Sequence, residues 1–470
     1  MAALLRSRPF PEGGATGKGL SMATAVPTQA AAAAAYPALR QARFSQLMIG
    51  LIGLFVAMDV TVVGLLVEPM KHDLGLSDVQ VGLVHTTSFF AAYGLLALPM
   101  GILADRTRRV RLLAIAMCLW CASLLLVGLS HDLWLLAGAK ALMGAALAMT
   151  YPAGMSLMAD NFAPERRAFP SVTFGMGQDL GGGAGLLIGG LGYSSLVAMV
   201  AANGDALAGI APWRAVSLVF AGIGVLLIPP VMAMREPARM EVKAAGNGSF
   251  RELWAYRAFL LPLFAGMFAL GGLVSGLRLW FAPALMRLYD LEPGDFAVWL
   301  SIVMLIGGFS GHMLSGKLVG LAGAQRGDAA AVRLAALAAI MCIPTSFLAM
   351  MPGTGGFGAL AGIFMIASGI AISIPVIVIN LRIPNELRGL CMGMYVVLIS
   401  VSGMIGAPLI GYASQRLGGD AMLGGAIALV GAPFALIAAV SFWVAGTSRS
   451  DRQPVQAGEG GPAAGVQAGA

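Results

Sequence analysis

Long apolar stretches separated by short polar ones recur twelve times along this chain, between about residues 44 and 446. Each stretch holds about 20 or more mostly apolar residues, which an α-helix needs to span a hydrocarbon core about 30 Å thick. The strands of a membrane β-barrel would be about ten residues long and would alternate polar with apolar residues. The pattern therefore predicts an all-α, polytopic membrane protein.

The expected spans form two sets of six on either side of a polar link. We expect them at 44–69, 79–103, 110–129, 133–158, 168–195, 213–234, 256–287, 294–320, 331–351, 355–379, 388–414 and 420–446. The predicted domains are a disordered tail (1–43), a six-helix bundle (44–234), a linker (235–255), a second bundle (256–446) and a second disordered tail (447–470). Two similar bundles predict an internally repeated transporter whose site lies between them near the membrane midplane.

The charges support this topology. Hydrophobic residues make up 58% of the chain and charged residues 11%, which is too little charge to cover a soluble domain of this size. If both termini are cytoplasmic, 23 of the 29 Lys and Arg residues lie on the cytoplasmic side, as the positive-inside rule requires. We therefore expect a bacterial plasma membrane protein with both termini inside. The net charge of +7 then reflects topology and attraction to membrane lipids, and predicts no nucleic-acid partner.

Motifs of enzymes are missing from the sequence. The spans contain no Walker loop, HExxH or GxSxG motif and no clustered metal ligands, so we expect no enzyme activity, cofactor or metal. The four cysteines lie in or beside apolar segments, which predicts no disulfide. We expect a monomer. A membrane-embedded enzyme and a transporter-like sensor that binds without transporting are the alternatives that we considered.

One loop carries a specific motif. The stretch GILADRTRRV (101–110) resembles the signature loop of the major facilitator superfamily, with Gly101, Asp105, Arg106 and Arg109 at the matching positions. The resemblance implies twelve helices in two pseudo-symmetric bundles and a cytoplasmic gate. Asp160, at the end of the fourth span, is a candidate partner for the basic residues of this gate. The alternative is that these arginines only follow the positive-inside rule.

Further stretches resemble the spinster-like and anion:cation-symporter branches of that superfamily. They are MDVTVVGLLVEPMKHDLGLSDVQVGLV, GAKALMGAALAMTYPAGMSLMADNFAPERRA, LWFAPALMRLYDLEPGDFAVWL and IPNELRGLCMGM. Val60 follows Asp59 where those branches usually have an arginine, and Lys140 stands where an arginine is more typical. The resemblance implies lipids, lysolipids or organic anions as substrates.

Asp59 is a carboxylate inside an apolar span, which costs about 2.5–3.5 kcal/mol on insertion scales. At about 1.5 Å per residue it lies roughly 22 Å into the first span, while Lys140 lies about 10 Å into the fourth from the other side. The two side chains are thus at a similar depth and a pair is possible. We predict that Asp59 exchanges between pairing and protonation and so couples protons to transport. A permanent ion pair, or a side chain reaching the outer interface, is the alternative.

Other polar residues lie inside spans. Asp179 is a second candidate proton site, unless it only caps a helix distorted by the glycines that follow it. Candidate substrate contacts are Lys140, Arg278, Gln178 and His85. Arg278 would supply a cation to an anionic substrate, or it would reach the interface beside Trp280. His85 is alternatively a packing residue that makes hydrogen bonds.

Glycines at intervals of four occur in the fifth and eighth spans. They are Gly181, Gly185 and Gly189, and then Gly307 and Gly311. Small residues at this interval let helices approach closely. We expect both stripes at the contact between the two bundles, where they would let the bundles rock. Ordinary glycine enrichment of membrane helices is the alternative.

The sequence thus predicts a secondary active transporter that moves a small organic solute by alternating access. We expect an organic anion or a lysolipid-like amphiphile as substrate and protons as the coupling ion. The alternative is a multidrug proton antiporter for apolar compounds, because Met143, Met149, Phe89 and Phe90 could form an apolar wall.

Overall fold

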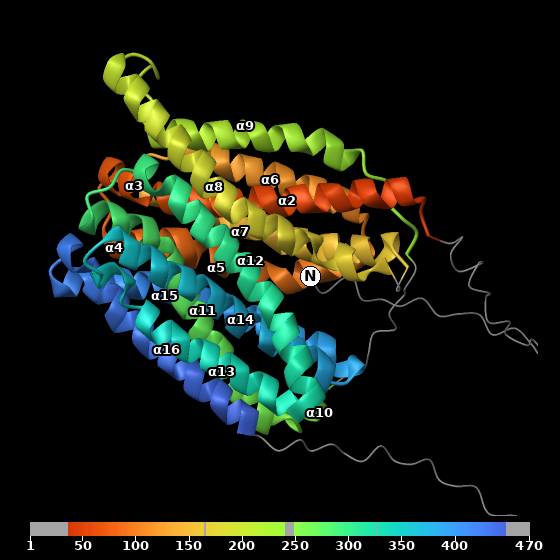
Figure 1. Ribbon diagram of the computed structural model, residues 1–470. Coiled ribbons are helices and arrows are strands. Elements are labelled where there is room, and N and C mark those ends of the chain that lie inside the picture. Colours follow the sequence, from red (N-terminus) through yellow and green to blue (C-terminus); the bar gives the residue numbers. More distant parts are fainter. Residues whose placement is uncertain (1–35, 164–165, 240–248, 327, 448–470) are drawn as a thin grey trace, which may run out of the picture. The chain divides into compact units, whose positions relative to one another are not determined.

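The computed structural model describes residues 36–163, 166–239, 249–326 and 328–447 (Figure 1). The predicted tails lie almost wholly outside these residues. The described residues from Pro37 onward form one compact unit. The limits that the sequence suggests for the two bundles, the linker and the tails stay a prediction.

Twelve stretches of helix in the described residues are long and apolar enough to cross a membrane, and the all-α fold with twelve spans is thereby confirmed. The first half of the molecule comprises α2 (Leu39–Leu65), the continuous α4 (Asp78–Gly82), η1 (Leu83–Ser88) and α5 (Phe89–Arg106), then α6 (Arg109–Leu129), α7 (Leu133–Asn161), α8 (Ala168–Ala202) and α9 (Pro212–Met232). The second half comprises α11 (Arg257–Leu288), α12 (Pro293–Arg326), α13 (Asp328–Thr345) with η3 (Leu348–Met350), α14 (Thr354–Arg382), α15 (Asn385–Leu417), and η4 (Asp420–Met422) with α16 (Leu423–Thr447). Short helices α3 (Val67–Leu74) and α10 (Phe250–Trp254) lie outside the spans.

The first span ends earlier than the sequence suggests. Helix α2 stops at Leu65, and α3 begins at Val67. The polar residues Glu68 and Lys71 follow within a turn, so the chain leaves the apolar helix where its composition changes. Gly75 ends α3 with φ +61°, a left-handed conformation that glycine adopts without steric cost.

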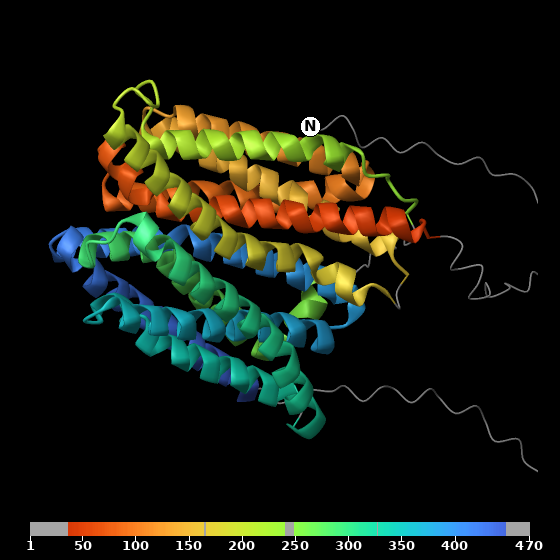
Figure 2. The same ribbon diagram turned by 45° about the horizontal axis from the view of Figure 1, so that its top comes forward.

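The two halves repeat one packing pattern. In the first half α2 packs on α8, α5 on α7, and α6 on α9; in the second half α11 packs on α15, α12 on α14, and α13 on α16. These are equivalent pairs of spans in the two sets of six. Figure 2 shows the helices of each half grouped together, red to yellow-green in one and green to blue in the other. The halves meet mainly along two seams, α8 with α12, and α15 with α4, η1 and α5, and more sparsely where α11 contacts α2 and α3.

The expectation that the glycine stripes face the other half is wrong. A Cβ atom on Gly181 would overlap the carbonyl oxygen of Leu54 in α2, so the stripe of α8 packs within the first half. Gly311 likewise packs on Ile366 of α14, within the second half. The seam itself is formed by Gly183 and other residues on the adjacent face of α8. Intervals of four identify a smooth face of a helix but do not say which neighbour covers it.

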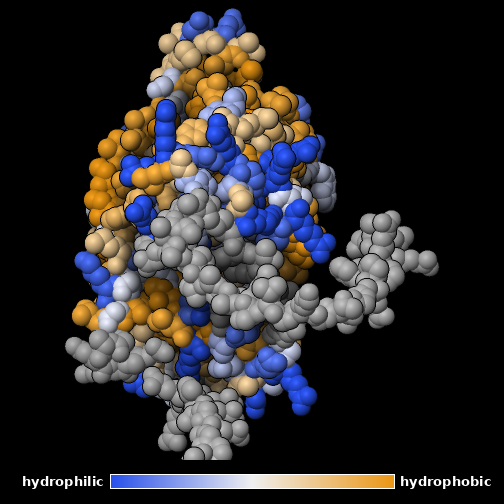
Figure 3. Space-filling view, turned by 90° about the vertical axis from the view of Figure 1, so that its right-hand side faces the viewer, coloured by the Kyte–Doolittle hydropathy of each residue, from blue (hydrophilic) through white to orange (hydrophobic). Residues whose placement is uncertain are grey.

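The ends of the bundle differ in polarity. Helix α2 begins and α16 ends at one end, which we call the termini face; the other end, with α3 and η4, is the opposite face. Exposed arginines such as Arg106, Arg108 and Arg251 lie at helix ends on the termini face. Figure 3 shows hydrophilic residues gathered on this face between hydrophobic flanks. Such a distribution is expected for helices that end at a membrane surface.

The contact between α2 and α8 gives a test of this packing. Gly181→Ala should lower the stability of the folded protein by about 1–3 kcal/mol, because the added methyl group forces the two helix backbones apart. The apparent melting temperature of the detergent-purified protein would measure this. Gly192→Ala in the same helix is the matched control, because a Cβ there meets no atom within 4 Å. Equal melting temperatures for the two variants would contradict the packing described.

Candidate functional site

Five charged side chains from both halves meet at the opposite face. Glu68, Lys71 and Asp78 belong to the first half, and Arg287 and Asp420 to the second. We call them the opposite-face cluster. The guanidinium of Arg287 donates to both carboxylate oxygens of Asp78, from Nη1 and Nη2, at 2.9 Å each, and its Nε donates to Glu68 at 2.8 Å. Bidentate pairing of this kind adds geometric specificity to the attraction of the charges.

Local sequence holds Asp78 in place. Ser77 and Gln80 form a capping box, in which the Ser77 hydroxyl accepts from the Gln80 backbone and the Gln80 side chain accepts from the Ser77 backbone. Asp78 therefore occupies the first turn of α4, where the helix dipole favours a carboxylate. The guanidinium of Arg287 lies 5.4 Å from the ring centroid of Trp280, which restricts it from the other side. Both partners of the pair are thus positioned by their own helices.

Lys71 connects the remaining charges of the opposite-face cluster. Its Nζ lies 2.9 Å from Asp78 and 2.7 Å from Asp420. Burial acts to lower the pKa of Lys71, but the carboxylates of Asp420 and Asp78 outweigh it and raise the pKa above its ordinary value. The charge of Lys71 is therefore present throughout the physiological range and is lost only when pH rises through that raised pKa.

The pair of Asp78 with Arg287 is at the centre of this cluster and is buried. Salt therefore screens it little, and removing one partner is costly. The side chains of Asp78 and Arg287 are 2% and 5% exposed, whereas that of Asp420 is 55% exposed. Salt screens buried pairs much less than exposed ones. Removing one partner of a buried pair typically costs about 3–5 kcal/mol, because a charge is left uncompensated. The opposite-face cluster therefore holds the two halves closed at this end.

Glycines mark several close contacts between the halves. Near the opposite face, Gly82 packs on Pro408 of α15, and in the middle of α8 Gly183 packs on Ser301 of α12. Nearer the termini face, a Cβ atom would meet nothing within 4 Å at Gly101 in α5, Gly175 in α8, Gly316 in α12, or Gly389 and Gly393 in α15. At these five glycines the described residues therefore show no close contact with the other half.

A second group of polar residues lies across the seam inside the membrane-spanning region. Asp179 of α8 lies 3.9 Å from Nε2 of His312 in α12. Nδ1 of His312 is 2.8 Å from the hydroxyl of Ser373 in α14. Arg278 of α11 acts electrostatically on Asp179 and lies 4.0 Å from the sulfur of Met365. We call Asp179, His312, Ser373 and Arg278 the seam cluster.

The seam cluster bears on two alternatives left open by the sequence. Arg278 is exposed and interacts electrostatically with Asp179 across the seam, while Trp280 is fully buried and donates to the Ala407 carbonyl oxygen. A substrate contact at Arg278 stays a prediction. Asp179 lies within α8 and faces His312, so it does not act as a helix cap. Gln178 is half-buried, and no hydrogen bond of its side chain is seen within the described ranges.

Asp59 and Lys140 lie in a third group, inside the first half. Both side chains are almost fully buried, at 1% and 2% exposure, so Asp59 does not reach the interface. Lys140 acts electrostatically on Asp59, but no ion pair joins them in the part of the chain that the structure describes. Lys140 Nζ instead lies 3.9 Å from the sulfur of Met143. Oδ2 of Asp59 is buried and makes no hydrogen bond of ordinary geometry among the described residues, although Trp120, whose Nε1 is also buried, lies beside the Asp59 carboxylate and interacts with it.

His85 adjoins this buried group. It lies in η1, a π-helical turn, and neither ring nitrogen has a hydrogen-bond partner among the described residues. Lys140 acts on it electrostatically, so His85, Lys140 and Asp59 share one apolar enclosure. The neighbouring Thr87 donates to the Met404 carbonyl oxygen at 2.7 Å, which joins the halves. π-turns are frequent at functional sites, and this one places a polar face against α15.

Three tyrosines from three different spans lie close to one another. The phenol groups of Tyr93, Tyr151 and Tyr395 interact electrostatically with one another, although they come from α5, α7 and α15. The ring of Tyr151 makes an edge contact with Phe174 of α8. The sequence analysis did not select these tyrosines, because nothing in one chain shows that they converge.

Two of the four residues that the sequence suggests for an apolar wall are buried. Met143 and Phe89 are buried within the first half, at 2% and 9% exposure. The ring of Phe90 packs against Gly403 of α15. Two of the four suggested wall residues are therefore covered by neighbouring helices, because the period of a helix does not fix its rotation in the bundle.

The signature loop lies at the termini face and contacts its own half. Arg109 is fully buried and pairs with Asp160 of α7 and with Glu236, at 2.7 Å, in the segment after α9. This pairing joins α6, α7 and the linker, and it does not by itself connect the halves. Asp105 and Arg106 are exposed. Gly101 has open space on its Cβ side.

The sequence analysis also did not predict that the residues of the opposite-face cluster come together. Lys71 and Arg287 are two of the basic residues that the positive-inside rule leaves unexplained, and this exception was a usable signal. The pattern S-x-x-Q at Ser77–Gln80 was another, because it marks a helix start. In the described part of the chain no three His, Cys, Asp or Glu side chains are placed to hold a metal ion.

The sequence matches the Major Facilitator Superfamily over residues 49–407, which is more than half of the chain. A curated relative, an MFS-type efflux pump of Mycolicibacterium smegmatis, is 25% identical over 407 residues. That match covers 85% of this chain and 91% of the relative.

Solved structures share the fold. A bacterial homologue of the human lysosomal transporter Spinster, in an inward-facing and unoccupied conformation, superimposes with a TM-score of 0.72 at 19% identity, covering 87% of this chain and 98% of that one. The nucleoside transporter NupG gives a TM-score of 0.61 at 16% identity, with 87% and 99% covered. At these identities the similarity shows the fold alone.

The opposite-face cluster predicts a change in conformation when its arginine is neutralised. Arg287→Gln should raise the population open at the opposite face by on the order of ten-fold or more, because Asp78 and Glu68 lose their buried cation. Spin labels on cysteines placed at Trp134 and Met422, both exposed on this face, would measure the distance between the halves after Cys118 is removed.

The matched control for this experiment is Arg214→Gln. Arg214 also forms an ion pair on this face, at 2.9 Å, but its partner Asp73 belongs to the same half. The control should leave the distance distribution unchanged. Identical distributions for both variants would show that the cluster does not hold the halves together.

Proposed function

Because the chain belongs to the Major Facilitator Superfamily, we propose that this secondary transporter moves a small organic solute by alternating access and couples the movement to protons. The family consists of membrane transporters and not of enzymes. The chain is accordingly a multi-pass membrane protein with a small-molecule substrate. The coupling ion, the substrate class and the orientation in the membrane are the parts that we propose.

The observation that carries the proposal is the approach of Asp179 to His312 across the seam. A carboxyl and an imidazole are both groups that exchange protons, and here they belong to halves that must separate during alternating access. When the halves move, each group changes its electrostatic partner and its access to water. The proton affinity of the pair therefore depends on the conformation, which is what coupling requires.

The buried group around Asp59 supports a second proton site. Asp59 and Lys140 are enclosed by the first half, and one carboxylate oxygen makes no hydrogen bond of ordinary geometry among the described residues. A buried carboxylate whose hydrogen bonds are incomplete is costly to keep charged, and protonation reduces that cost. Small rearrangements of α2 against α7 would change the distance to Lys140. We propose that Asp59 takes up and releases a proton during the cycle.

The conformation described here corresponds, in this proposal, to an inward-facing state. The termini face would be cytoplasmic, in agreement with the basic residues that gather there. Asp105 and Arg106 are exposed on that face, free to meet the second half when it closes. The residues Gly101, Asp105, Arg106, Arg109 and Asp160 would then form the cytoplasmic gate, and the opposite-face cluster would be its counterpart on the outside.

We propose that the substrate is an amphiphile with an anionic group. Arg278 of the seam cluster offers a guanidinium, which suits a carboxylate or phosphate. Tyr93, Tyr151 and Tyr395 offer apolar ring faces with hydroxyl groups, which suit an apolar or aromatic portion. Lys140, His85 and Gln178 stay candidate contacts.

Proton-coupled export of apolar compounds is the second candidate. It is favoured by the relative that is named an MFS-type efflux pump. The two candidates differ in the direction of the gradient that drives uptake into proteoliposomes. A symporter would accumulate substrate with an alkaline interior, whereas an antiporter would accumulate it with an acidic interior.

Coupling can be tested with two carboxamide variants. Asp179→Asn and Asp59→Asn should abolish accumulation of substrate driven by a pH gradient, because neither side chain can release a proton. Exchange of labelled for unlabelled substrate at equal pH should persist. The measurement is uptake into proteoliposomes with a panel that contains a sugar acid, a lysophospholipid and an amphipathic cationic dye.

The control for these variants is Asp205→Asn, which changes an exposed residue in the loop before α9. It should accumulate substrate like the unaltered protein. Gradient-driven accumulation that survives in both carboxamide variants would refute proton coupling at these residues.

The role of Arg278 is tested by the charge of the substrate. Arg278→Gln should weaken binding of anionic members of the panel by on the order of ten-fold or more, because hydrogen bonds to charged groups are worth about 1.5–3 kcal/mol. Binding of the cationic dye should not weaken. Competition against a labelled substrate in detergent would measure both affinities, and an equal loss for anions and cations would contradict a specific contact.

A further inference from the structure

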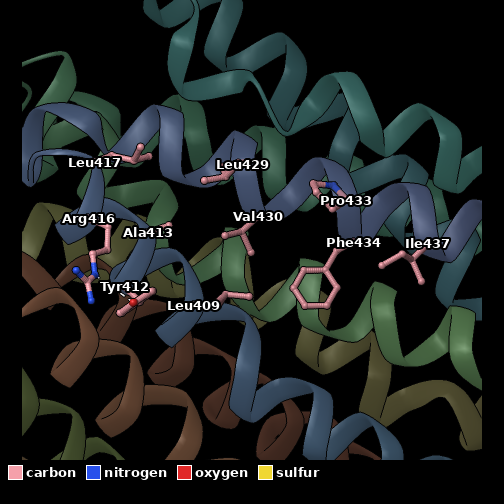
Figure 4. A pocket seen from close by; sticks show the side chains of 10 residues that line it. All are labelled: Leu409, Tyr412, Ala413, Arg416, Leu417, Leu429, Val430, Pro433, Phe434 and Ile437. Atoms are coloured by element: carbon pink, nitrogen blue, oxygen red, sulfur yellow. Dashed lines mark hydrogen bonds between the residues drawn. The ribbon is translucent and has the colours of Figure 1, made fainter.

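A groove opens between α15 and α16 on the surface of the second half, away from the seam cluster (Figure 4). Its volume is about 480 Å³, which lies within the range of small-molecule sites in proteins. Leu409 of α15 and Leu429, Val430, Phe434 and Ile437 of α16 line it. The wall is apolar along nearly its whole length.

The packing of α16 explains why the groove is present. Phe434 turns towards α11, where a Cβ atom on Gly272 would lie 3.1 Å from its ring. The ring therefore fills space beneath the groove rather than the groove itself. The preceding residue, Pro433, has no backbone N–H to donate and lines the groove at the same level. A gap thus remains between the two helices.

One end of the groove carries a cation. Arg416 lies in the last turn of α15, and its Nε donates to the hydroxyl of Tyr412 at 3.0 Å. Its guanidinium lies 5.2 Å from the Tyr412 ring centroid. No carboxylate pairs with Arg416 among the described residues; the nearby Asp420 pairs instead with Lys71 and Arg287. The remaining N–H groups of Arg416 are available to an anion.

The order of these groups along the span matches an amphiphile. Arg416 and Tyr412 lie near the end of the helix at the opposite face, where arginine and tyrosine typically meet the membrane surface. From there, Leu429 to Ile437 extend about 12 Å towards the membrane interior, at about 1.5 Å per residue. A ligand with an anionic head and an apolar chain would place both parts against matching groups.

We propose that the groove between α15 and α16 binds an anionic phospholipid of the surrounding membrane. Its phosphate contacts Arg416, and one acyl chain lies along Leu429, Val430 and Ile437. This is a resident lipid at the outer surface of the second half and is distinct from the transported solute. It also lies beside the opposite-face cluster, because Asp420 follows Arg416 after four residues.

Two variants test the head and the chain separately. Native mass spectrometry of the full-length protein, released from detergent with equal amounts of phosphatidylglycerol and phosphatidylcholine, measures which lipid is retained. The unaltered protein should prefer phosphatidylglycerol. Arg416→Gln should reduce this preference about five-fold, since a basic residue near anionic lipid is worth about 1 kcal/mol. Leu429→Trp should fill the groove and reduce retention of both lipids.

Each variant has a matched control. Arg251→Gln removes an exposed arginine at the other face and should keep the preference. Leu436→Trp changes a leucine of α16 that is 53% exposed, against 58% for Leu429, but does not line the groove. Equal retention by the two tryptophan variants, or an equal preference in the two glutamine variants, would overturn the proposal. So would the absence of any preference in the unaltered protein.

Discussion

The pair of Asp78 with Arg287 joins the two halves of this molecule at the opposite face. It is bidentate, almost fully buried and formed between the two halves, so it fixes their distance at the opposite face. The helices that carry these residues extend from that point through the molecule, so this contact constrains how the two halves can be placed. Nearer the termini face, a Cβ atom on Gly101 in α5 or Gly389 in α15 would have open space.

The charged residues inside the molecule differ by what they join. Arg109 with Asp160 and Glu236 pairs within the first half and its following segment, and the group of Asp59, Lys140 and His85 also lies within the first half. The opposite-face cluster and the seam cluster instead connect two bodies that move. A charge that is compensated within one half keeps its partner through any rigid-body motion, whereas a charge compensated across the seam loses it. Only the electrostatic partners of charges paired across the seam change directly when the halves move relative to each other.

The sequence predicts the spans well because their length and apolarity are set by the membrane alone. It also identifies Asp59, Asp179 and Arg278 as unusual, since their cost in an apolar helix depends on no neighbour. The sequence does not predict contacts that depend on how each helix is rotated about its axis and on which helix it packs against. The stripe at Gly181 was assigned to the wrong neighbour, and the approach of His312 to Asp179 was not foreseen. Those contacts depend on which of several smooth faces each helix buries, and this is settled by packing of the whole bundle.

The π-turn at Leu83–Ser88 has a geometric consequence for the seam. In a regular α-helix, residues five apart point in clearly different directions, so Gly82 and Thr87 would not share a face. The wider turn brings the fifth residue back above the first. Gly82 can then receive Pro408 while Thr87 bonds to Met404, on successive levels of the same partner helix. The extra residue of the π-turn changes the direction of the side chains that follow it. Residues before and after the turn can therefore both face α15.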